Sequence, residues 1–584
     1  MKTNINVASS NADNRRTPNS NRYATSWAIA ACAIGMTCSV IGAESVSFTR
    51  ITQGAITTDR QQFMAVAWGD YDSDGDLDVY FTSTGGHVGA LYRNAGLGAF
   101  ERVASVPITT DANFGIGCAW ADFDNDGDLD LFRSNWISEP SRFYRNDGGT
   151  FSRVLLGSAQ DRSMGVAWGD YDNDGHLDLF LPSGGVARFS TRLPGNLYHN
   201  DRRGRLTKMP ASTVGPIAST SASGISGVWS DFNGDGLLDL FVANYGEPNS
   251  LFLNSPDHRF VRVTEGALVQ DSGSFTSCAL GDYDNDGDLD LFVANGSSSQ
   301  PSSLYRNDGG GTFSKITEGA VVTDLAQSLG ATWGDYDNDG WLDLFVANGE
   351  SVQENNFLYR NNGDGTFTRV LEGSVANDGG ASLGCAWGDY DNDGFLDLIV
   401  ANGALRTTGF EPNLPEVNFL YHNDAGNGNR WIRIKCVGTA SNRSGIGAKV
   451  RVRATIAGKT FWQLREISSG NGFCGNAIDA HFGLGDADRV DLLRVEWPSG
   501  IVQEFHDLSV NRSLTLTEPA RLQVSGPGAF RVQSWKGMVF EVQASTDLKQ
   551  WSPVTTVTNL TGTLEFTDPD AAKQSQHFFR TALK

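Results

Sequence analysis

The sequence predicts an all-β fold: a seven-bladed β-propeller, then a small β-rich module, then a C-terminal β-sandwich. An acidic stretch returns roughly every 50 residues, each repeat holds four strand-like segments, and the repetition stops near residue 429. Units of this length cannot bury an apolar face alone, so they must stack on their neighbours. The acidic stretch starts seven times, at Asp70, Asp122, Asp170, Asp231, Asp282, Asp335 and Asp389.

Residues 331–371 illustrate one repeat. The segments ATWGDYD, WLDLFVAN, NNFLYRN and GTFTRVLEG each have strand composition, and NDG between the first two is a tight turn. Four short antiparallel strands form one propeller blade, and blades arranged radially leave only short, protected edges. We therefore expect the propeller to span residues 44–429.

The two ends of the repeat array predict how the ring closes. The last repeat supplies three strands and then runs into unrelated sequence at residue 430, so it lacks a fourth strand. A segment with fourth-strand character, VSFTRITQG at 46–54, precedes the first repeat. We expect this segment to complete the last blade, because closure removes exposed strand edges.

Bulky residues stand two positions before each acidic stretch, on the expected innermost strands. We expect them to fill the space between blades rather than to stack on a ligand. They are Trp68, Trp120, Trp168, Trp229, Leu280, Trp333 and Trp387.

Three cysteines occupy one equivalent repeat position, which predicts small buried apolar side chains rather than a redox centre: Cys118, Cys278 and Cys385. Cys436 and Cys474 remain as a possible disulfide, and the sequence leaves this open.

Six of the seven acidic stretches place carboxylates at loop positions 1, 3, 5 and 9, and all seven have glycine at position 6. This pattern suits a hard, oxygen-seeking dication, because alternate side chains of a tight turn point inward and glycine permits the bend. Position 7 would offer its backbone carbonyl. Solvated acidic turns are the alternative interpretation, but seven recurrences at fixed spacing favour Ca²⁺, with up to seven ions. Mg²⁺ is less suited, since it prefers a small octahedral shell that retains water.

The expected metal ligands at positions 1, 3, 5, 7 and 9 of the seven loops are Asp70, Asp72, Asp74, Asp76 and Asp78; Asp122, Asp124, Asp126, Asp128 and Asp130; Asp170, Asp172, Asp174, His176 and Asp178; Asp231, Asn233, Asp235, Leu237 and Asp239; Asp282, Asp284, Asp286, Asp288 and Asp290; Asp335, Asp337, Asp339, Trp341 and Asp343; and Asp389, Asp391, Asp393, Phe395 and Asp397. The fourth loop has Asn233 and only three carboxylates, so it should bind most weakly.

The units W-G-D-Y-D-N-D-G-D-L-D-L-F resemble FG-GAP (VCBS-type) repeats, similar to those of the integrin α-subunit propeller. The resemblance covers about residues 46–428. It implies a propeller fold and carries calcium ligation onto Asp70, Asp72, Asp74, Asp76, Asp78 and their counterparts. It says little about what the protein binds.

Residues 430–518 form a second β-rich region by their strand and turn composition. The strings SNRSGIGAKV, REISSGNGF, HFGLG and EWPSG resemble the ASPIC/UnbV domain, which follows FG-GAP repeats in cartilage acidic protein-like proteins. Arg465, Glu466 and His481 could form an acid–base set if they converge. Residues next to glycine-rich turns more often satisfy backbone groups, so we favour structural roles for all three.

Residues 519–584 alternate apolar and polar side chains over several short segments, which predicts a small β-sandwich. This segment is similar to C-terminal modules that end in F-[FY]-R in exported bacterial proteins. That resemblance is compatible with attachment, sorting or glycan contact.

The N-terminus and the net charge indicate an exported protein. Residues 1–43 combine a polar, arginine-containing start with the apolar run WAIAACAIGMTCSVIGA, which is typical of a signal peptide cleaved after Ala43. Lipoprotein processing at Cys32 is the alternative. No later apolar run is long enough to cross a membrane, and a formal net charge of −23 disfavours nucleic acid and anionic membranes as partners.

Two functions fit these observations. The first is an exported, secreted, periplasmic or cell-surface calcium-binding propeller that mediates extracellular protein or glycan binding or adhesion. Its recognition loops would be 183–196, 208–226 and 403–417, with Arg188, Arg192 and Arg406 as contacts. The alternative is a calcium-dependent polysaccharide lyase or hydrolase with its site in the propeller funnel. The sequence contains no G-x-S-x-G, no H-E-x-x-H and no phosphate loop, which favours the first.

Overall fold

A computed structural model describes residues 47–583 except 85, 113, 136–139, 156–162, 185–191, 350–352, 404–415, 527–528, 535–538, 547–548, 560–562 and 568–577. The chain divides into two compact units, Met1–Ala43 and Glu44–Lys584. The first unit, which carries the predicted signal peptide, lies outside the described residues.

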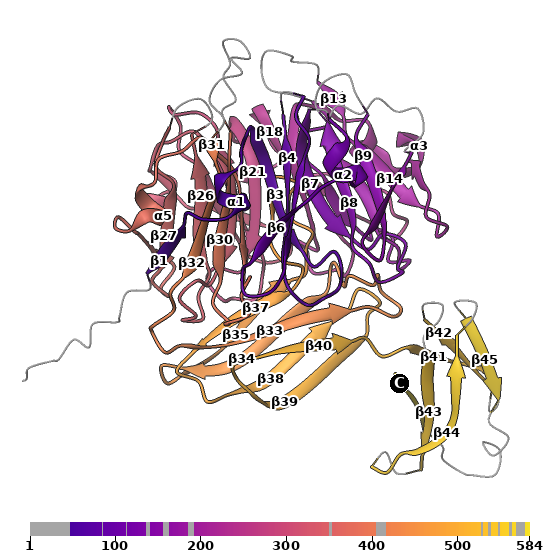
Figure 1. Ribbon diagram of the computed structural model, residues 1–584. Coiled ribbons are helices and arrows are strands. Elements are labelled where there is room, and N and C mark those ends of the chain that lie inside the picture. Colours follow the sequence, from indigo (N-terminus) through magenta and orange to yellow (C-terminus); the bar gives the residue numbers. More distant parts are fainter. Residues whose placement is uncertain are drawn as a thin grey trace, which may run out of the picture. The chain divides into compact units, whose positions relative to one another are not determined.

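The repeats fold into a β-propeller, as the sequence predicts (Figure 1). Within the described residues the strands group into seven four-stranded antiparallel units, here called blades 1 to 7. The second strand of blade 4 also pairs with the first strand of blade 5, Tyr245 opposite Ser274, so these two blades form one continuous sheet. In chain order the blades are β3 (Phe63–Gly69), β4 (Asp78–Ser83), β5 (Ala90–Asn94) and β6 (Phe100–Val103); β7 (Gly115–Ala121), β8 (Asp130–Asn135), β9 (Arg142–Asp147) and β10 (Thr150–Val154); β11 (Ala167–Gly169), β12 (Asp178–Leu181), β14 (Asn196–Asn200) and β15 (Leu206–Lys208); β17 (Gly224–Ser230), β18 (Asp239–Pro248), β19 (Ser250–Leu253) and β20 (Val261–Arg262); β21 (Ser272–Gly281), β22 (Asp290–Asn295), β23 (Ser303–Asn307) and β24 (Phe313–Lys315); β25 (Ser328–Gly334), β26 (Asp343–Asn348), β27 (Phe357–Asn361) and β28 (Phe367–Arg369); and β29 (Ser382–Gly388), β30 (Asp397–Asn402), β32 (Phe419–Asn423) and β1 (Phe48–Ile51).

The first strand of each blade lies innermost. These strands contact one another in the order β3, β7, β11, β17, β21, β25 and β29, and β29 contacts β3 again. The N-terminal strand β1 pairs antiparallel with β32, Arg50 opposite Tyr421, and so supplies the fourth strand of the last blade. The expected ring closure is confirmed.

Large aromatic residues fill the space between blades, as predicted. Trp68, Trp120, Trp168 and Trp387 are fully buried, and Trp68 stacks on Tyr390 of the preceding blade. The glycine that follows the tryptophan in the preceding blade makes room for this indole. A methyl group on Gly388 would lie 2.9 Å from Trp68 Cδ1. In each W-G pair, therefore, the tryptophan packs against the preceding blade and the glycine leaves space for the indole of the following blade.

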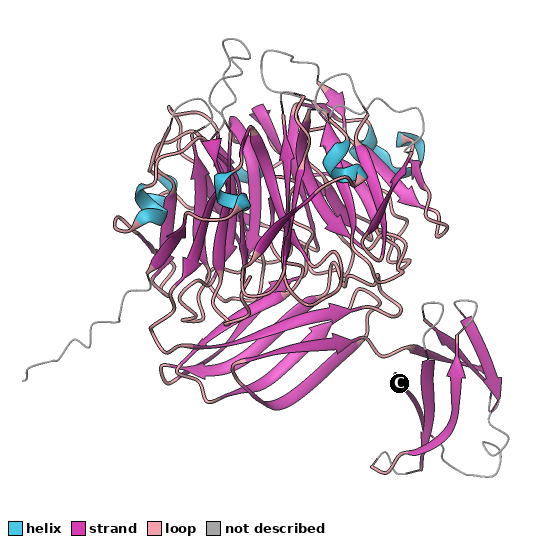
Figure 2. Cartoon of the chain, in the orientation of Figure 1, coloured by secondary structure: helices cyan, strands magenta, loops and turns pink. Residues whose placement is uncertain are grey.

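Short connecting elements accompany the blades (Figure 2). The described helices are single turns, and none is long or apolar enough to cross a membrane. They are α1 (Ala55–Thr58), α2 (Pro107–Thr110), α3 (Ala211–Val214), η2 (Gly215–Ala218), α4 (Ala267–Gln270), η3 (Ala320–Val322) and α5 (Ser374–Asn377). Two-stranded pairs extend two of the connections: β2 (Arg60–Gln61) with β31 (Glu416–Val417), and β13 (Leu193–Pro194) with β16 (Ser221–Ala222).

The module at 430–518 contains two sheets, β37-β33-β40 and β35-β34-β38-β39, around one apolar core. Its strands are β33 (Arg430–Val437), β34 (Lys449–Ile456), β35 (Lys459–Glu466), β37 (Ala480–Gly485), β38 (Arg489–Glu496), β39 (Val502–Ser509) and β40 (Arg512–Thr517). One further strand, β36 (Cys474–Gly475), leaves the module and pairs parallel with β3 of the propeller.

The last segment forms two three-stranded sheets, which confirms the expected small sandwich. They are β41 (Arg521–Gly526), β42 (Ala529–Gln533) and β45 (Thr563–Thr567), and β43 (Val539–Ser545), β44 (Ser552–Thr558) and β46 (Phe578–Leu583). Val532 of one sheet and Phe540 of the other share an apolar cluster, so the two sheets pack face to face.

Candidate metal centres and the capped propeller channel

The seven acidic loops (70–78, 122–130, 170–178, 231–239, 282–290, 335–343 and 389–397) join the first and second strands of each blade. Position 6 has a positive φ in every loop, from 86° at Gly236 to 109° at Gly127, which only glycine adopts readily. In each loop the position-5 carboxylate accepts the position-7 backbone N–H; the Asp393 to Phe395 distance is 2.8 Å. The glycine at position 6 and the hydrogen bond from position 7 to position 5 thus fix the conformation of each loop.

The structure brings the predicted ligand side chains together. In several loops, groups of three carboxylate or imidazole atoms lie within 4.8 Å of one another. These groups include Asp70, Asp72 and Asp78; Asp122, Asp124 and Asp130; and Asp170, Asp172 and Asp174. Hard oxygen donors gathered at this spacing could hold a divalent cation.

The position-9 aspartate has a structural task that the sequence interpretation missed. In each blade its two oxygens accept two backbone N–H groups, one from loop position 2 and one from the end of the third strand. Asp78, for example, accepts from Tyr71 N at 3.1 Å and from Asn94 N at 2.8 Å. All seven position-9 aspartates are 0 % exposed. This carboxylate therefore anchors the loop, and only its remaining lone pairs could face a cation.

Several position-1 and position-3 oxygens have no partner within the described residues. Both carboxylate oxygens of Asp282 are buried and unpaired, as are single oxygens of Asp70, Asp72, Asp124 and Asp389. Burial raises the pKa of Asp282 to about 7 and that of Asp389 to about 8. Buried carboxyls are normally paired or bound to metal, so these orphaned oxygens fit a cation as the missing partner.

Basic side chains from the third strand of the blades also reach the loops. Arg93 Nε lies 2.7 Å from Asp72, and Arg360 Nε lies 2.8 Å from Asp337. In blades 3 and 7 a histidine replaces the arginine, and His199 Nδ1 lies 3.2 Å from Asp178. The repeated Y-R-N and Y-H-N strings carried this signal, which the sequence interpretation overlooked. The equivalent residues are Arg93, Arg145, His199, Leu253, Arg306, Arg360 and His422.

Loop four differs from the others in its side chains. The third strand of its blade offers Leu253 in place of a cation, so its counter-charge comes from Lys449 Nζ of the module, 3.1 Å from the position-1 carboxylate. Position 3 is Asn233, whose amide donates to Asp235 at 3.1 Å. This loop thus has both fewer carboxylates and a different counter-charge.

The asparagine at the end of the third strand links each blade to the one before it. Asn361 Nδ2 donates to Tyr283 O of the preceding blade at 2.7 Å. The same bond recurs around the ring, from Asn94 to Tyr390, Asn146 to Tyr71, Asn200 to Phe123, Asn254 to Tyr171, Asn307 to Phe232, Asn361 to Tyr283 and Asn423 to Tyr336. The acidic-loop end of the propeller is therefore a closed belt of hydrogen bonds.

The module at 430–518 contacts this acidic end of the blades through basic side chains. Arg433, Lys435, Arg443 and Lys449 lie within 4.0 Å of position-1 carboxylates. Their partners are Asp389, Asp70, Asp122 and Asp231, respectively. In these four loops position 1 is thus the carboxylate shared between the candidate metal site and a basic side chain of the module.

Residues 468–476 of the module, here called the plug, enter the propeller channel. Gly472 O accepts from Cys118 N at 2.8 Å, and Phe473 O accepts from Val66 N at 3.3 Å. The side chain of Asn471 donates to Cys278 O in blade 5. A segment that touches the innermost strands on opposite sides of the ring must lie on its axis.

An apolar ring closes the channel around Phe473, which is 1 % exposed. The ring consists of residues from the inner edges of blades 1, 2, 3, 4, 6 and 7 and forms one buried cluster with Phe473: Met64, Ile116, Met164, Ile225, Leu329 and Leu383. The channel is therefore packed like a protein core rather than open like a funnel.

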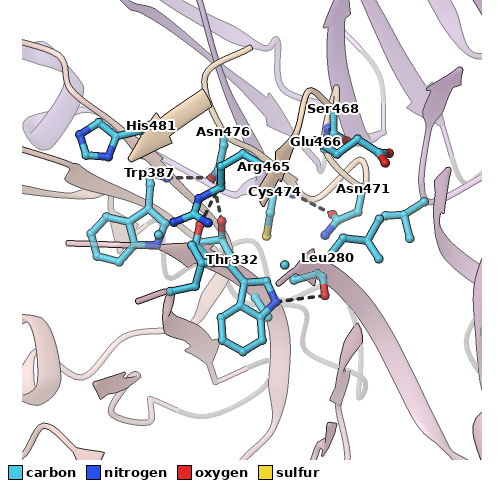
Figure 3. A pocket seen from close by; sticks show the side chains of 18 of the residues that line it. Leu280, Thr332, Trp387, Arg465, Glu466, Ser468, Asn471, Cys474, Asn476 and His481 are labelled. Atoms are coloured by element: carbon cyan, nitrogen blue, oxygen red, sulfur yellow. Dashed lines mark hydrogen bonds between the residues drawn. The ribbon is translucent and has the colours of Figure 1, made fainter. Parts of the chain in front are cut away.

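Arg465, Glu466 and His481 line one cavity of about 160 Å³ between the plug and blades 5 to 7 (Figure 3). Figure 3 shows His481 and Glu466 at opposite ends of it, with Arg465 between them. Nε2 of His481 lies 3.1 Å from Gly394 O, and burial lowers the pKa of His481 to about 3. The buried imidazole is thus neutral and its Nε2–H donates to a backbone carbonyl, which is the structural role favoured from the sequence.

Of the recognition loops expected from the sequence, 208–226 is described and contains α3, η2 and β16, whereas residues 185–191 and 404–415 of the other two, with Arg188 and Arg406, lie outside the described residues. Arg192 is described and forms an ion pair with Glu247. The cysteines at the equivalent repeat position are buried as predicted, whereas Cys436 and Cys474 are not paired with each other.

Comparison with known proteins agrees with this architecture. The family described as FG-GAP-like repeat matches residues 70–133, 136–181, 231–293, 282–346 and 335–400, and the family described as ASPIC and UnbV matches residues 438–523. Cartilage acidic protein 1 from Homo sapiens is 29 % identical over 304 residues, which are 49 % of this chain and 40 % of the relative. The protein of the same name from Mus musculus is 29 % identical over 306 residues, 49 % and 41 % of the two chains. The match thus spans about two fifths of each relative's length.

Among solved structures, YCF48 bound to D1 peptide aligns with a TM-score of 0.40 at 10 % identity, covering 65 % of this chain and 96 % of that one. The exotype rhamnogalacturonan lyase YesX aligns with a TM-score of 0.37 at 14 % identity, covering 65 % and 76 %. On the repeat pattern, the sheet topology and the two matched families, this chain is a β-propeller protein of FG-GAP-like repeats that carries an ASPIC and UnbV domain.

Proposed function

We propose that this chain is an exported calcium-binding β-propeller protein that binds an extracellular protein or glycan. The observation that carries the proposal is the ring of acidic loops at one end of the blades, in which buried carboxylate oxygens converge and several lack any partner. Up to seven Ca²⁺ ions would supply those partners.

Electrostatics explains why the loops need a cation. Two carboxylates about 4 Å apart repel by roughly 4 kcal/mol at an effective dielectric near 20, and each loop contains several such pairs. The arginines and lysines described above offset part of this repulsion. They leave both oxygens of Asp282 without a partner. Position-1, position-3 and position-5 carboxylates would hold the ion, with the position-7 carbonyl and the free lone pairs of position 9.

Export and extracellular binding are supported by three features. The N-terminal segment has signal-peptide composition, the curated relatives are named for cartilage, and calcium modules outside cells work at about 10⁻⁴ to 10⁻³ M Ca²⁺. A ring stiffened by calcium would serve as a rigid scaffold for recognition loops.

The ligand surface should lie away from the acidic loops. The module at 430–518 contacts that end of the blades, and the plug fills the channel. The described strands that flank 183–196, 208–226 and 403–417 are second and third strands, or fourth and first strands, and the ends from which these connections start lie at the other end of the blades. We expect an extracellular partner to bind at this end.

The alternative of a lyase or hydrolase requires a substrate-accessible funnel. In the described residues the plug and the apolar ring occupy the channel axis. The cavity that remains is about 160 Å³, far below the roughly 300–1,000 Å³ of typical ligand pockets. No observation therefore favours the alternative over binding.

Metal content tests the calcium proposal directly. Purified protein should retain calcium in elemental analysis, and chelation should lower its melting temperature. At ten times Kd each site adds roughly 1.4 kcal/mol to the free energy of unfolding. Asp284→Ala should remove more calcium-dependent stability than Asn233→Ala in the weak fourth loop. Asp507→Asn is the control, because its side chain is 71 % exposed and lies outside the loops.

A glycan and protein array probed with and without calcium tests the binding proposal. We expect a ligand whose capture falls when calcium is chelated and survives Asp507→Asn. Protein that contains no calcium and folds equally well in chelator would contradict the calcium proposal. Calcium-loaded protein that captures nothing on either array would instead count against the binding role alone.

A further inference from the structure

Two cysteines from parts of the chain 89 residues apart meet on the propeller axis. Cys385 lies on β29, the innermost strand of blade 7, and Cys474 lies on β36 within the plug. Their sulfur atoms are 3.6 Å apart, and both side chains are buried. Cys436, which the sequence left open as a disulfide partner for Cys474, packs instead in the core of the module.

The surrounding structure holds this pair in place from both sides. The plug backbone is fixed by the parallel pairing of Cys474 with Val66 and by the Asn476 side chain, which accepts from Trp387 N at 2.9 Å. Trp387 lies two residues after Cys385 on the same strand. A disulfide needs a sulfur–sulfur distance of about 2.05 Å, so the two sulfur atoms must approach each other by roughly 1.5 Å for the bond to form.

We propose that Cys385 and Cys474 form a reversible disulfide that fastens the plug, and with it the module at 430–518, to blade 7 of the propeller. The proposal goes beyond calcium and ligand binding, because it assigns a covalent lock between the two folded parts.

The chemistry balances with a small disulfide such as oxidised glutathione as the oxidant. The Cys474 thiolate attacks one sulfur of that disulfide, forming a mixed disulfide and expelling one glutathione thiolate. The Cys385 thiolate then attacks the Cys474 sulfur and expels the second. Two protein thiols are oxidised, one small disulfide is reduced to two thiols, and the protons lost by the protein thiols pass to the released thiolates.

The burial of the pair sets the order of the two steps. Cys385 is 0 % and Cys474 4 % exposed in the folded protein, so a small disulfide can reach them only before the plug is seated. The mixed disulfide should therefore form at Cys474 while the plug is still outside the channel, and the thiol of Cys385 should resolve it as the plug enters.

Peptide mapping of the full chain tests the proposal. The protein is unfolded, refolded in oxidised or reduced glutathione, denatured with the alkylating agent present, and cut with trypsin without reduction. Cleavage after Arg369 and Arg465 places Cys385 and Cys474 in separate peptides. We expect the oxidised sample to contain the two peptides joined, and the joined pair to disappear on reduction.

Matched variants complete the design. Cys385→Ser and Cys474→Ser should each abolish the joined pair, whereas Cys436→Ser should retain it. The melting temperature of oxidised wild type should fall by several degrees when reductant is added, and that of Cys385→Ser should not change. The melting temperature of each variant with reductant is compared with that of the same variant without reductant, so a lower overall stability of a variant does not affect the result. Full alkylation of both cysteines after oxidation, or Cys474 joined to Cys118 or Cys278, would overturn the proposal.

Discussion

Replacing Phe473 by alanine should strongly lower the free energy of unfolding, because Phe473 packs the plug against the propeller. Its ring is 1 % exposed and lies inside an apolar cluster to which six blades contribute. Aromatic side chains bury about 150–250 Å², which at about 25 cal/mol per Å² corresponds to roughly 4–6 kcal/mol. The alanine methyl recovers part of this, and closed β-sheets cannot collapse far into the void. We therefore expect a loss of about 3–5 kcal/mol.

Urea denaturation followed by tryptophan fluorescence measures this loss, because Trp387 is a member of the same apolar cluster. Phe473→Leu preserves most of the volume and should cost about 1 kcal/mol. Leu97→Ala removes a side chain that is 84 % exposed and should change the free energy of unfolding by less than about 0.5 kcal/mol. If Phe473→Ala lost no more than Phe473→Leu, the channel could not be packed as a core and the reasoning would fail.

Three further perturbations follow from the geometry. In chelator, the free energy of unfolding should fall as pH rises from about 4 towards 8. Burial raises the pKa of Asp78 to about 8, so the folded state keeps a proton that the unfolded chain releases. Saturating calcium should reverse this trend, and melting temperatures measured across the pH range check it. Asn361→Ala should cost about 1–3 kcal/mol in urea denaturation, since it leaves Tyr283 O without the amide donor of the blade-to-blade belt. Gly388→Ala should cost about 1–3 kcal/mol in the same assay, because the new methyl would press on Trp68.

Each of these has a matched control. Calcium should raise the melting temperature more at pH 8 than at pH 5, and an equal rise at both values would show that the buried carboxyls do not take up protons. Asn362→Ala alters the exposed neighbour of Asn361 and should be nearly neutral. Gly379→Ala places a methyl no closer than 3.5 Å to any neighbour, so a cost equal to that of Gly388→Ala would rule out a steric cause.

The repeated sequence pattern was sufficient to predict the propeller, because each blade depends mainly on local order. Strand composition, the D-x-D-x-D-G turn and the apolar wedge two residues before it recur within each repeat, and a repeat needs only its neighbours to bury its faces. The orphan fourth strand at 46–54 and the burial of Cys118, Cys278 and Cys385 could be inferred in the same way. The carboxylates of the candidate metal sites lie close together because they are close in sequence.

Features built from distant segments escaped prediction. The double role of Asp78 and its equivalents depends on a backbone N–H from the third strand, and the asparagine belt depends on the preceding blade. The residues that make both contacts belong to the recurring L-Y-R-N strings. A recurring residue, however, does not show which distant group it will contact. Arg465, Glu466 and His481 line one cavity, which their sequence spacing could not show.

The sequence by itself determined the β-propeller, its acidic loops and the order of its modules, because those depend on local turns and on contacts between adjacent repeats. Only the tertiary structure showed that basic side chains of the module at 430–518 contact the acidic loops and that Phe473 and Cys474 lie in the propeller channel. The physical reason is that contacts between segments far apart in the chain depend on shape and charge complementarity of folded surfaces. No periodicity in the sequence records that complementarity.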